Sequence, residues 1–219
     1  MKYNVLVFDW DGTLYDSAAS IVSCLQQGFK KLELPEPSDK EIRNIIGLRS
    51  DVAVKTLAPQ LDDKTIDMVI KEYRFRINSL TDTRPALFNG AKKVLTDLKK
   101  NNYLLAIATG KARTCFNSDL NFLQLNDFFV TTRCSDESFS KPNPHMLLDI
   151  VTELAVDKEN VIMVGDSQYD MQFANNAGVD ALAVTYGVHD RERLGKSSVK
   201  GFIDNIIELP NWLELARLS

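Results

Sequence analysis

A short apolar run that ends in two acidic residues is the feature that most constrains how this sequence can fold. Asn4–Phe8 has the continuous apolar pattern of a strand that is buried on both faces of a parallel sheet. Asp9 and Asp11 follow at once, and Gly12 permits a tight turn. In open α/β sheets, ligands bind at the carboxyl ends of the strands. The pattern therefore predicts two carboxylates in a binding crevice, although an isolated acidic pair could equally cap a turn.

Strand-like and helix-like segments alternate through the second half of the sequence. Further apolar runs are predicted strands: Tyr103–Ala108, Phe128–Thr131, Val161–Val164 and Ala181–Val184. Amphipathic segments beside them are predicted helices: Ala91–Leu98, Ala112–Leu123, Met146–Ala155 and Met171–Ala177. This alternation is typical of the α/β class with a doubly wound parallel sheet.

The segment between the first strand and Tyr103 has a purely helical pattern. Apolar residues recur at helical spacing over Ala18–Leu32 and again over Ile66–Ile77. Ser38 and Glu41 have the spacing of a capping box that opens a short helix between them. We therefore expect an all-helical insert in the α/β core. The predicted ranges are 16–84 for the helical domain and 1–15 with 85–219 for the core.

The composition excludes several classes of protein. Of 219 residues, 44% are hydrophobic, which is enough for a sizeable core, and the formal charge of −4 disfavours nonspecific binding to nucleic acid or anionic membrane. No apolar stretch nears the ~18 residues of a membrane span, and the N-terminal run is too short for a signal peptide. The three cysteines form no CxxC pair. We expect a cytoplasmic monomer or homodimer without a nucleic-acid or membrane partner.

Polar groups also follow the later predicted strands. Thr109 and Gly110 offer a hydroxyl and free backbone N–H groups at a helix start, an arrangement that binds phosphate. Asp166 and Asp170 lie at another strand-to-helix turn. Each group could instead be a simple helix cap, and Lys141 by itself would be a solvated surface charge.

Several carboxylates converging on one crevice would need a nearby positive charge. Carboxylates that converge on one crevice raise one another's pKa unless a cation is present. Mg²⁺ suits one or two carboxylates together with phosphate oxygen and water, and Lys141 can add positive charge for a phosphoryl group. A carboxylate nucleophile that forms an aspartyl phosphate is then chemically sensible.

The order and spacing of these groups resemble the four signature motifs of the haloacid dehalogenase (HAD) superfamily. The matching segments are Asp9-x-Asp11-Gly12-Thr13-Leu14-x-Asp16-Ser17, Thr109-Gly110, Lys141-Pro142 and Gly165-Asp166-Ser167-x-x-Asp170. The resemblance covers essentially the whole chain. It implies a Rossmann-like core, and the helical insert looks like the family's type 1 cap.

The resemblance implies a role for each matching residue. Asp9 would be the nucleophile and a Mg²⁺ ligand, and Asp11 would be the general acid and base whose backbone carbonyl binds the metal. A carboxylate at position 11 favours phosphate-ester hydrolysis over dehalogenation. Phosphomutases share that carboxylate, but Thr13 resembles the Asp-Gly-Thr of the phosphatases more closely.

The remaining motifs would bind the phosphoryl group and the metal. Thr109, Gly110 and Lys141 would hold the phosphoryl oxygens, with Lys141 also steadying the nucleophile. Asp166 would bind Mg²⁺ directly, and Asp170 would support the metal site from nearby.

Substrate choice in this superfamily depends mainly on the cap. Arg49 lies in the break Ile46–Ser50 between two predicted helices, where it could pair with a substrate carboxylate or second phosphate, or be a solvated surface residue. The segments Arg113-Thr114 and 133–142 resemble the phosphoglycolate phosphatase and pyrophosphatase branch.

The expected function is hydrolysis of a small, phosphoglycolate-like phosphate monoester with Mg²⁺, through an aspartyl phosphate. A β-phosphoglucomutase-like phosphomutase and a pyrophosphatase are the enzymatic alternatives. A phosphorylation-sensing domain similar to response-regulator receivers is the non-enzymatic one. Receivers carry their acceptor on a later strand and lack a long helical insert, whereas here Asp9 follows the first strand.

Overall fold

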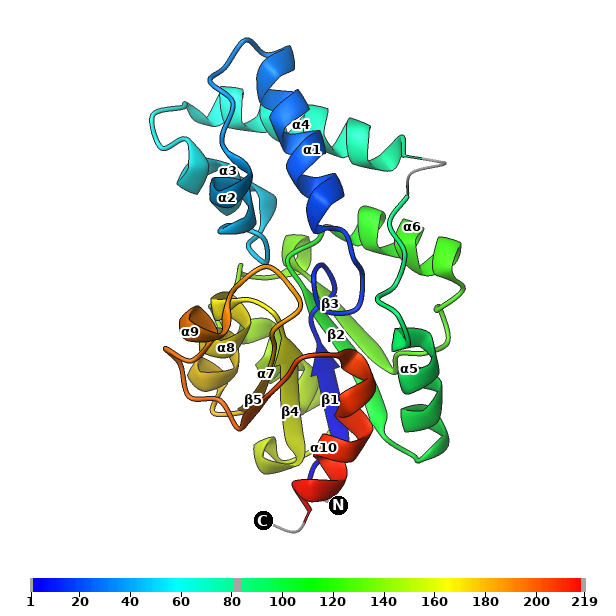
Figure 1. The fold of residues 1–219 in the computed structure, drawn as a ribbon. Coiled ribbons are helices and arrows are strands. Elements are labelled where there is room, and N and C mark those ends of the chain that lie inside the picture. The colour runs from blue at the N-terminus through cyan, green and yellow to red at the C-terminus, as the bar shows by residue number, and fades with distance from the viewer. Residues whose placement is uncertain (1, 81–83, 218–219) are drawn as a thin grey trace.

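The computed structural model describes residues 2–80 and 84–217 and contains one parallel sheet (Figure 1). Its six strands have the order β3-β2-β1-β4-β5-β6. They are β1 (Val5–Phe8), β2 (Leu104–Thr109), β3 (Thr131–Cys134), β4 (Val161–Gly165), β5 (Asp180–Val184) and β6 (Gly201–Ile203). The order changes direction between β1 and β4, which is where a doubly wound sheet opens a crevice. The doubly wound α/β fold is therefore confirmed.

Helices cover both faces of the sheet, which explains why its central strands are apolar throughout. On one face lie α5 (Ala91–Lys100), α6 (Arg113–Leu123) and α10 (Leu209–Leu215); on the other lie α7 (His145–Glu153), α8 (Gln168–Ala177) and α9 (Arg191–Leu194). Leu6 and Phe8 pack into the first of these layers, and Val5 and Val7 into the second. A strand with two buried faces cannot alternate polar and apolar residues.

The insertion between β1 and β2 forms a helical cap beyond the carboxyl end of the sheet (Figure 1). The cap helices are α1 (Ala18–Lys31), α2 (Asp39–Arg43), α3 (Ser50–Leu57) and α4 (Asp63–Asn78). They enclose a core of their own, and the capping box of Ser38 and Glu41 forms as the sequence predicts. The predicted domain ranges stay a prediction, and their residues 81–83 and 218–219 lie outside the described part of the chain.

The third strand lies later than the apolar pattern indicates. The predicted strand was Phe128–Thr131, but β3 pairs with β2 through Thr131–Cys134. The backbone N–H of Phe128 donates to the carbonyl of Leu125 in a turn, and the two phenylalanines at 128 and 129 pack against the core from that loop. Because β3 is an edge strand, its own sequence is polar and carries no continuous apolar signal.

The C-terminal segment contains one strand that the sequence did not predict and one leucine that is exposed where burial was predicted. The three-residue edge strand Gly201–Ile203 was not predicted, because it is too short to show a pattern. The apolar residues Trp212, Leu213 and Leu215 predict a C-terminal helix that docks on the core. That helix is present as α10 with Leu213 buried, but Leu215 is 59% exposed and faces solvent.

Two expectations from composition can be compared with the described residues. The sequence predicts that the three cysteines act as small apolar core residues. Cys24, Cys115 and Cys134 are indeed all buried and free. Within residues 2–80 and 84–217, no helix combines the length and the apolarity that a membrane crossing requires.

Candidate active site

The fold brings the polar residues at three strand ends together. Phe8 lies opposite Ile107 of β2 and Val164 of β4, so the carboxyl ends of these three strands lie at the same level. Asp9 follows β1, Thr109 is the last residue of β2, and Asp166 follows β4. The predicted residues buried in this cluster are each at most 1% exposed: Asp9, Thr109, Lys141, Asp166 and Asp170.

Lys141 lies inside this cluster, not on the surface. Its Nζ is 2.6 Å from Oδ1 of Asp9 and 2.6 Å from Oδ1 of Asp170. Burial alone would lower the pKa of Lys141, but the charges of Asp170 and Asp9 outweigh burial and raise that pKa. The lysine is therefore a permanent positive charge beside Asp9.

Asp166 is held by donors on both of its oxygens. Oδ1 accepts from the hydroxyl of Thr13 at 2.8 Å, and Oδ2 accepts from the backbone N–H of Val188 at 2.8 Å. Burial, together with the charge of Asp170, raises the pKa of Asp166 to about 7. Gly12 is required beside it, because its φ is +92° and an added Cβ would lie 2.2 Å from Oδ2 of Asp166.

Three buried carboxylates could hold a metal ion. Asp9, Asp166 and Asp170 each offer an oxygen, and these atoms lie within 4.8 Å of one another. Burial raises the pKa of Asp9, Lys141 opposes that shift, and the charges of Asp170 and Asp166 add to it. Three carboxylates beside one ammonium group leave an excess of negative charge, which a hard divalent cation with oxygen ligands would offset.

The three carboxylates are not equally available to a metal. Both oxygens of Asp170 already accept hydrogen bonds: Oδ1 from Lys141, and Oδ2 from the backbone N–H and hydroxyl of Ser167 at 3.0 and 2.6 Å. In Asp9, only Oδ1 has such a donor among the described residues. This difference favours Asp9 and Asp166 as ligands, with Asp170 supporting the site through Lys141.

Asp11 lies at the same crevice but turns toward a second lysine. Its Oδ1 accepts from Nζ of Lys111 at 2.8 Å and from the hydroxyl of Ser17 at 2.6 Å. Lys111 also lies 3.2 Å from Oδ2 of Asp119 on α6. Burial alone would lower the pKa of Lys111, and the charges of Asp11 and Asp119 more than reverse this and raise it. Lys111 therefore stays charged between two carboxylates.

Sequence reasoning missed Lys111 as a site residue. The only signal was its place directly after Thr109 and Gly110, and nothing in that spacing shows that the side chain is buried against α6. Trp10 belongs to the same network, since its Nε1 donates to Oδ2 of Asp119 at 3.2 Å. The tryptophan thus orients the carboxylate that balances Lys111.

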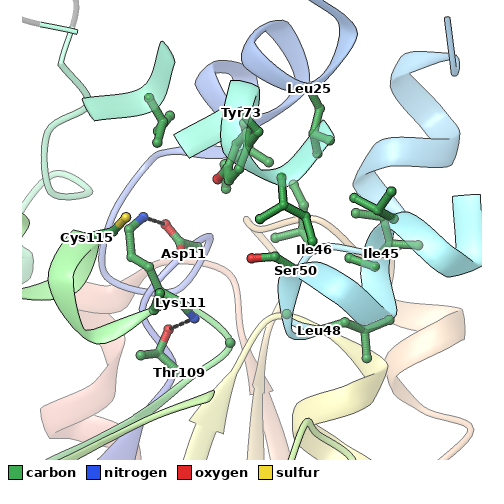
Figure 2. A pocket seen from close by; sticks show the side chains of 18 of the residues that line it. Asp11, Leu25, Ile45, Ile46, Leu48, Ser50, Tyr73, Thr109, Lys111 and Cys115 are labelled. Atoms are coloured by element: carbon green, nitrogen blue, oxygen red, sulfur yellow. Dashed lines mark hydrogen bonds and ion pairs between the residues drawn. The ribbon is translucent and has the colours of Figure 1, made fainter. Parts of the chain in front are cut away.

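A cavity between the cap and the core is lined by part of this polar cluster (Figure 2). It has about 710 Å³ of unfilled space, part of which opens to solvent. The core side of its lining is polar and includes Asp9, Asp11, Thr109 and Lys111. The loop 46–50 of the cap closes directly over Gly110, where an added Cβ would lie 2.5 Å from a backbone carbonyl of that loop.

Arg49 is not brought together with the other predicted site residues. Among the residues that the structure describes, Arg49 is not one of those that line the cavity. Its Nε and Nη2 donate to the two oxygens of Asp51 at 2.6 and 2.7 Å, and its Nη1 donates to the carbonyl of Ser138 at 3.2 Å. Its backbone N–H donates to the hydroxyl of Ser140 at 2.9 Å. In this geometry Arg49 links the cap to the core loop before Lys141.

The fold and this cluster define a hydrolase of the haloacid dehalogenase type. The family model of the haloacid dehalogenase-like hydrolases matches residues 6–184, which is most of the chain, and the chain belongs to that family. Its helical insertion between β1 and β2 has the position of the type 1 cap. This membership excludes the receiver-like alternative.

Known relatives span nearly the full length of the chain. It is 30% identical to "Probable phosphatase IndB" of Dickeya dadantii, over 94% of this chain and 91% of the relative. It is 28% identical to the pyrophosphatase PpaX of Halalkalibacterium halodurans, over 88% of each chain, and 28% identical to a phosphoglycolate phosphatase of Mesorhizobium japonicum, over 87% of this chain and 86% of the relative. The predicted resemblance to this branch is thus confirmed.

A solved structure gives the same result for the fold. A protein of Bacteroides fragilis described as a haloacid dehalogenase-like hydrolase is 27% identical to this chain and superposes with a TM-score of 0.89. The match covers 95% of this chain and 100% of that protein, so it includes the cap as well as the core.

Proposed function

We propose that this chain is a Mg²⁺-dependent phosphatase that hydrolyses a small phosphate monoester through an aspartyl phosphate on Asp9. The observation that carries the proposal is the buried group of Asp9, Asp166 and Asp170 with Lys141 in contact with the first and the last. The names of the curated relatives support it, since they are a phosphatase, a phosphoglycolate phosphatase and a pyrophosphatase.

The first half of the reaction transfers the phosphoryl group to the protein. An oxygen of Asp9 attacks phosphorus, the ester P–O bond breaks, and its electron pair stays on the leaving oxygen. Asp11 donates a proton to that oxygen. Its Oδ1 is held by Lys111 and Ser17, while Oδ2 has no hydrogen bond within the described part of the chain and is free to reach the leaving group.

The phosphoryl oxygens need donors during this step. Oγ1 of Thr109 accepts a hydrogen bond from the backbone N–H of Lys111 at 3.1 Å, which leaves the Thr109 proton free for a phosphoryl oxygen. Lys141 favours the ionised form of Asp9 and offsets charge on the phosphoryl group. Mg²⁺, held by Asp9 and Asp166, would supply the remaining positive charge and help align the two reacting groups.

The second half of the reaction releases phosphate. Asp11, now ionised, takes a proton from water as the water oxygen attacks phosphorus, and the bond between Asp9 and phosphorus breaks. The products are inorganic phosphate, a free Asp9 carboxylate and a protonated Asp11, ready for another cycle. The cap loop over Gly110 limits access of bulk water to this intermediate.

A single-turnover experiment tests the intermediate. With excess protein, Mg²⁺ and a substrate that carries labelled phosphate, we expect labelled protein after an acid quench, with the label on the peptide that contains Asp9. Label on another residue would contradict the assignment of the nucleophile. In multiple turnovers, inorganic phosphate is the expected product, whereas a rearranged phosphate ester without phosphate release would indicate the phosphomutase alternative.

A further inference from the structure

The geometry points to a substrate whose leaving group is uncharged and largely apolar. This inference rests on the proposed function, because it concerns the part of the substrate that the cap would surround. It differs from the expectation of a phosphoglycolate-like substrate, in which the leaving group carries a carboxylate.

The cap side of the cavity is a wall of aliphatic side chains. It is formed by Ile21, Leu25, Ile45, Ile46, Ile70 and Ile77 (Figure 2). Such a wall gains free energy when it covers hydrocarbon, and it costs free energy when it strips water from a carboxylate or a second phosphate. The wall therefore favours a substrate whose leaving group is mainly hydrocarbon.

The cations near the wall are already engaged or lie in solvent. Lys111 contacts the carboxylates of both Asp11 and Asp119, so its charge is balanced within the protein. The Arg49 guanidinium is engaged by Asp51. Arg74 lines the cavity but is exposed, and a solvated charge attracts an anion only weakly. Among the described residues, the cap thus offers no buried cation to a second anionic group.

The wall does carry two neutral hydroxyl groups. Figure 2 shows Tyr73 reaching from α4 toward Asp11 and Lys111, and Ser50 directing its oxygen into the cavity. No hydrogen bond occupies either hydroxyl within residues 2–80 and 84–217. Burial raises the pKa of Tyr73, so its phenol is neutral. These two groups suit one or two uncharged polar atoms on an otherwise apolar leaving group.

Anionic leaving groups fit this arrangement poorly. The carboxylate of 2-phosphoglycolate, or the second phosphate of pyrophosphate, would lie between the aliphatic wall and Asp11. The wall disfavours such a group, because removing water from a charged group costs free energy. A neutral leaving group avoids this cost.

A comparison of simple substrates tests the inference. With the wild-type protein and Mg²⁺, kcat/KM would be measured from phosphate release for benzyl phosphate, ethyl phosphate and 2-phosphoglycolate, all of which are esters of primary alcohols. We expect benzyl phosphate to exceed 2-phosphoglycolate by about 10- to 100-fold, with ethyl phosphate between them. Equal rates, or a preference for 2-phosphoglycolate, would overturn the inference while leaving a phosphatase.

Failure of the proposed function would look different. In that case no substrate would release phosphate in a manner that depends on Asp9, whatever its leaving group. If phosphate release depends on Asp9 but 2-phosphoglycolate is the better substrate, the inference about the leaving group is wrong and the proposed reaction stands.

A variant of the wall supplies a second test. Ile77 lines the cavity and is only half-buried, so Ile77→Lys can place a cation there with little risk to the fold. We expect its benzyl phosphate to 2-phosphoglycolate ratio of kcat/KM to fall by about 10-fold or more, while Ile77→Met keeps the wild-type ratio within about threefold. An unchanged ratio in a folded Ile77→Lys protein would contradict the inference.

The exposed arginine of the lining gives a third test. The inference expects Arg74→Ala to change the benzyl phosphate to 2-phosphoglycolate ratio of kcat/KM by less than about twofold, because its charge is solvated. A loss confined to 2-phosphoglycolate would show that Arg74 binds an anionic leaving group and would overturn the inference.

Discussion

The two sides of the cavity are built in opposite ways. The core side carries the carboxylates of Asp9 and Asp11, each in contact with a buried lysine: Lys141 lies 2.6 Å from Asp9, and Lys111 lies 2.8 Å from Asp11. The cap side carries aliphatic side chains that are continuous with the cap's own core. The strand ends can hold charges in fixed positions because the sheet behind them is buried on both faces. The chemistry thus depends on the core side, and the cap side selects the substrate.

A change in the nucleophile should have the largest effect and should not depend on the substrate. Asp9→Asn replaces the attacking carboxylate with an amide, so we expect kcat to fall by about 10⁴-fold or more on benzyl phosphate and on 2-phosphoglycolate alike. Phosphate release under saturating substrate measures this. Asp127→Asn, at an exposed carboxylate, is the control and should match wild type. Wild-type turnover by Asp9→Asn would assign the chemistry to another residue.

Removal of the metal should be nearly as severe on every substrate. Excess chelator is expected to lower phosphate release by about 10³-fold, and added Mg²⁺ should restore it. Ca²⁺ should inhibit, because its larger coordination number can draw both oxygens of Asp9 onto the metal. Binding also has a readout without turnover: Mg²⁺ should raise the Tm of the wild-type protein, since it binds only the folded site, and should do so much less in Asp166→Asn. Full activity in chelator would contradict the metal assignment.

The core side could be predicted from sequence because parallel strands share one carboxyl edge. Asp9, Thr109 and Asp166 lie at the ends of three strands whose registers align, so a motif at each strand end is enough to bring them together. Lys141 was harder, since it comes from a loop. Charge balance predicted that it would serve the phosphoryl group, but only the resemblance to a family implied its contact with the nucleophile. The edge strand β3 was misplaced because its polar residues carry no apolar signal.

The cap side could not be predicted in the same way. Helical spacing identifies α1 and α4 but does not show which of their apolar residues face the core domain and which fill the cap itself. Tyr73 falls within the helical pattern of Ile66–Ile77, which does not show that its side chain reaches into the cavity. The pairing of Lys111 with Asp119 likewise depends on how α6 packs, which spacing along the chain does not encode.

Lys111 belongs to the core side, and its removal should therefore affect all substrates to a similar extent. Lys111→Met leaves the buried carboxylates of Asp11 and Asp119 without their shared cation, so we expect kcat/KM to fall by about 100-fold. Lys111→Arg keeps the charge and should lose less. The measurement is kcat/KM on benzyl phosphate and on 2-phosphoglycolate. A loss of kcat/KM confined to 2-phosphoglycolate would instead show that Lys111 binds the carboxylate of the leaving group.

Arg49 should give the smallest effect, because it belongs to neither side of the cavity. Its guanidinium contacts Asp51 and the carbonyl of Ser138, and its side chain is 36% exposed. A pair this accessible contributes at most about 1 kcal/mol, so Arg49→Ala should lower kcat/KM by less than about fivefold, and equally on both substrates, through a looser contact between cap and core. Asp51→Ala removes the same pair from the other partner and should have a similar effect. A loss of about 10-fold or more on 2-phosphoglycolate alone would show that Arg49 leaves Asp51 to bind a substrate carboxylate, and the cap would then select by charge as well as by its apolar wall.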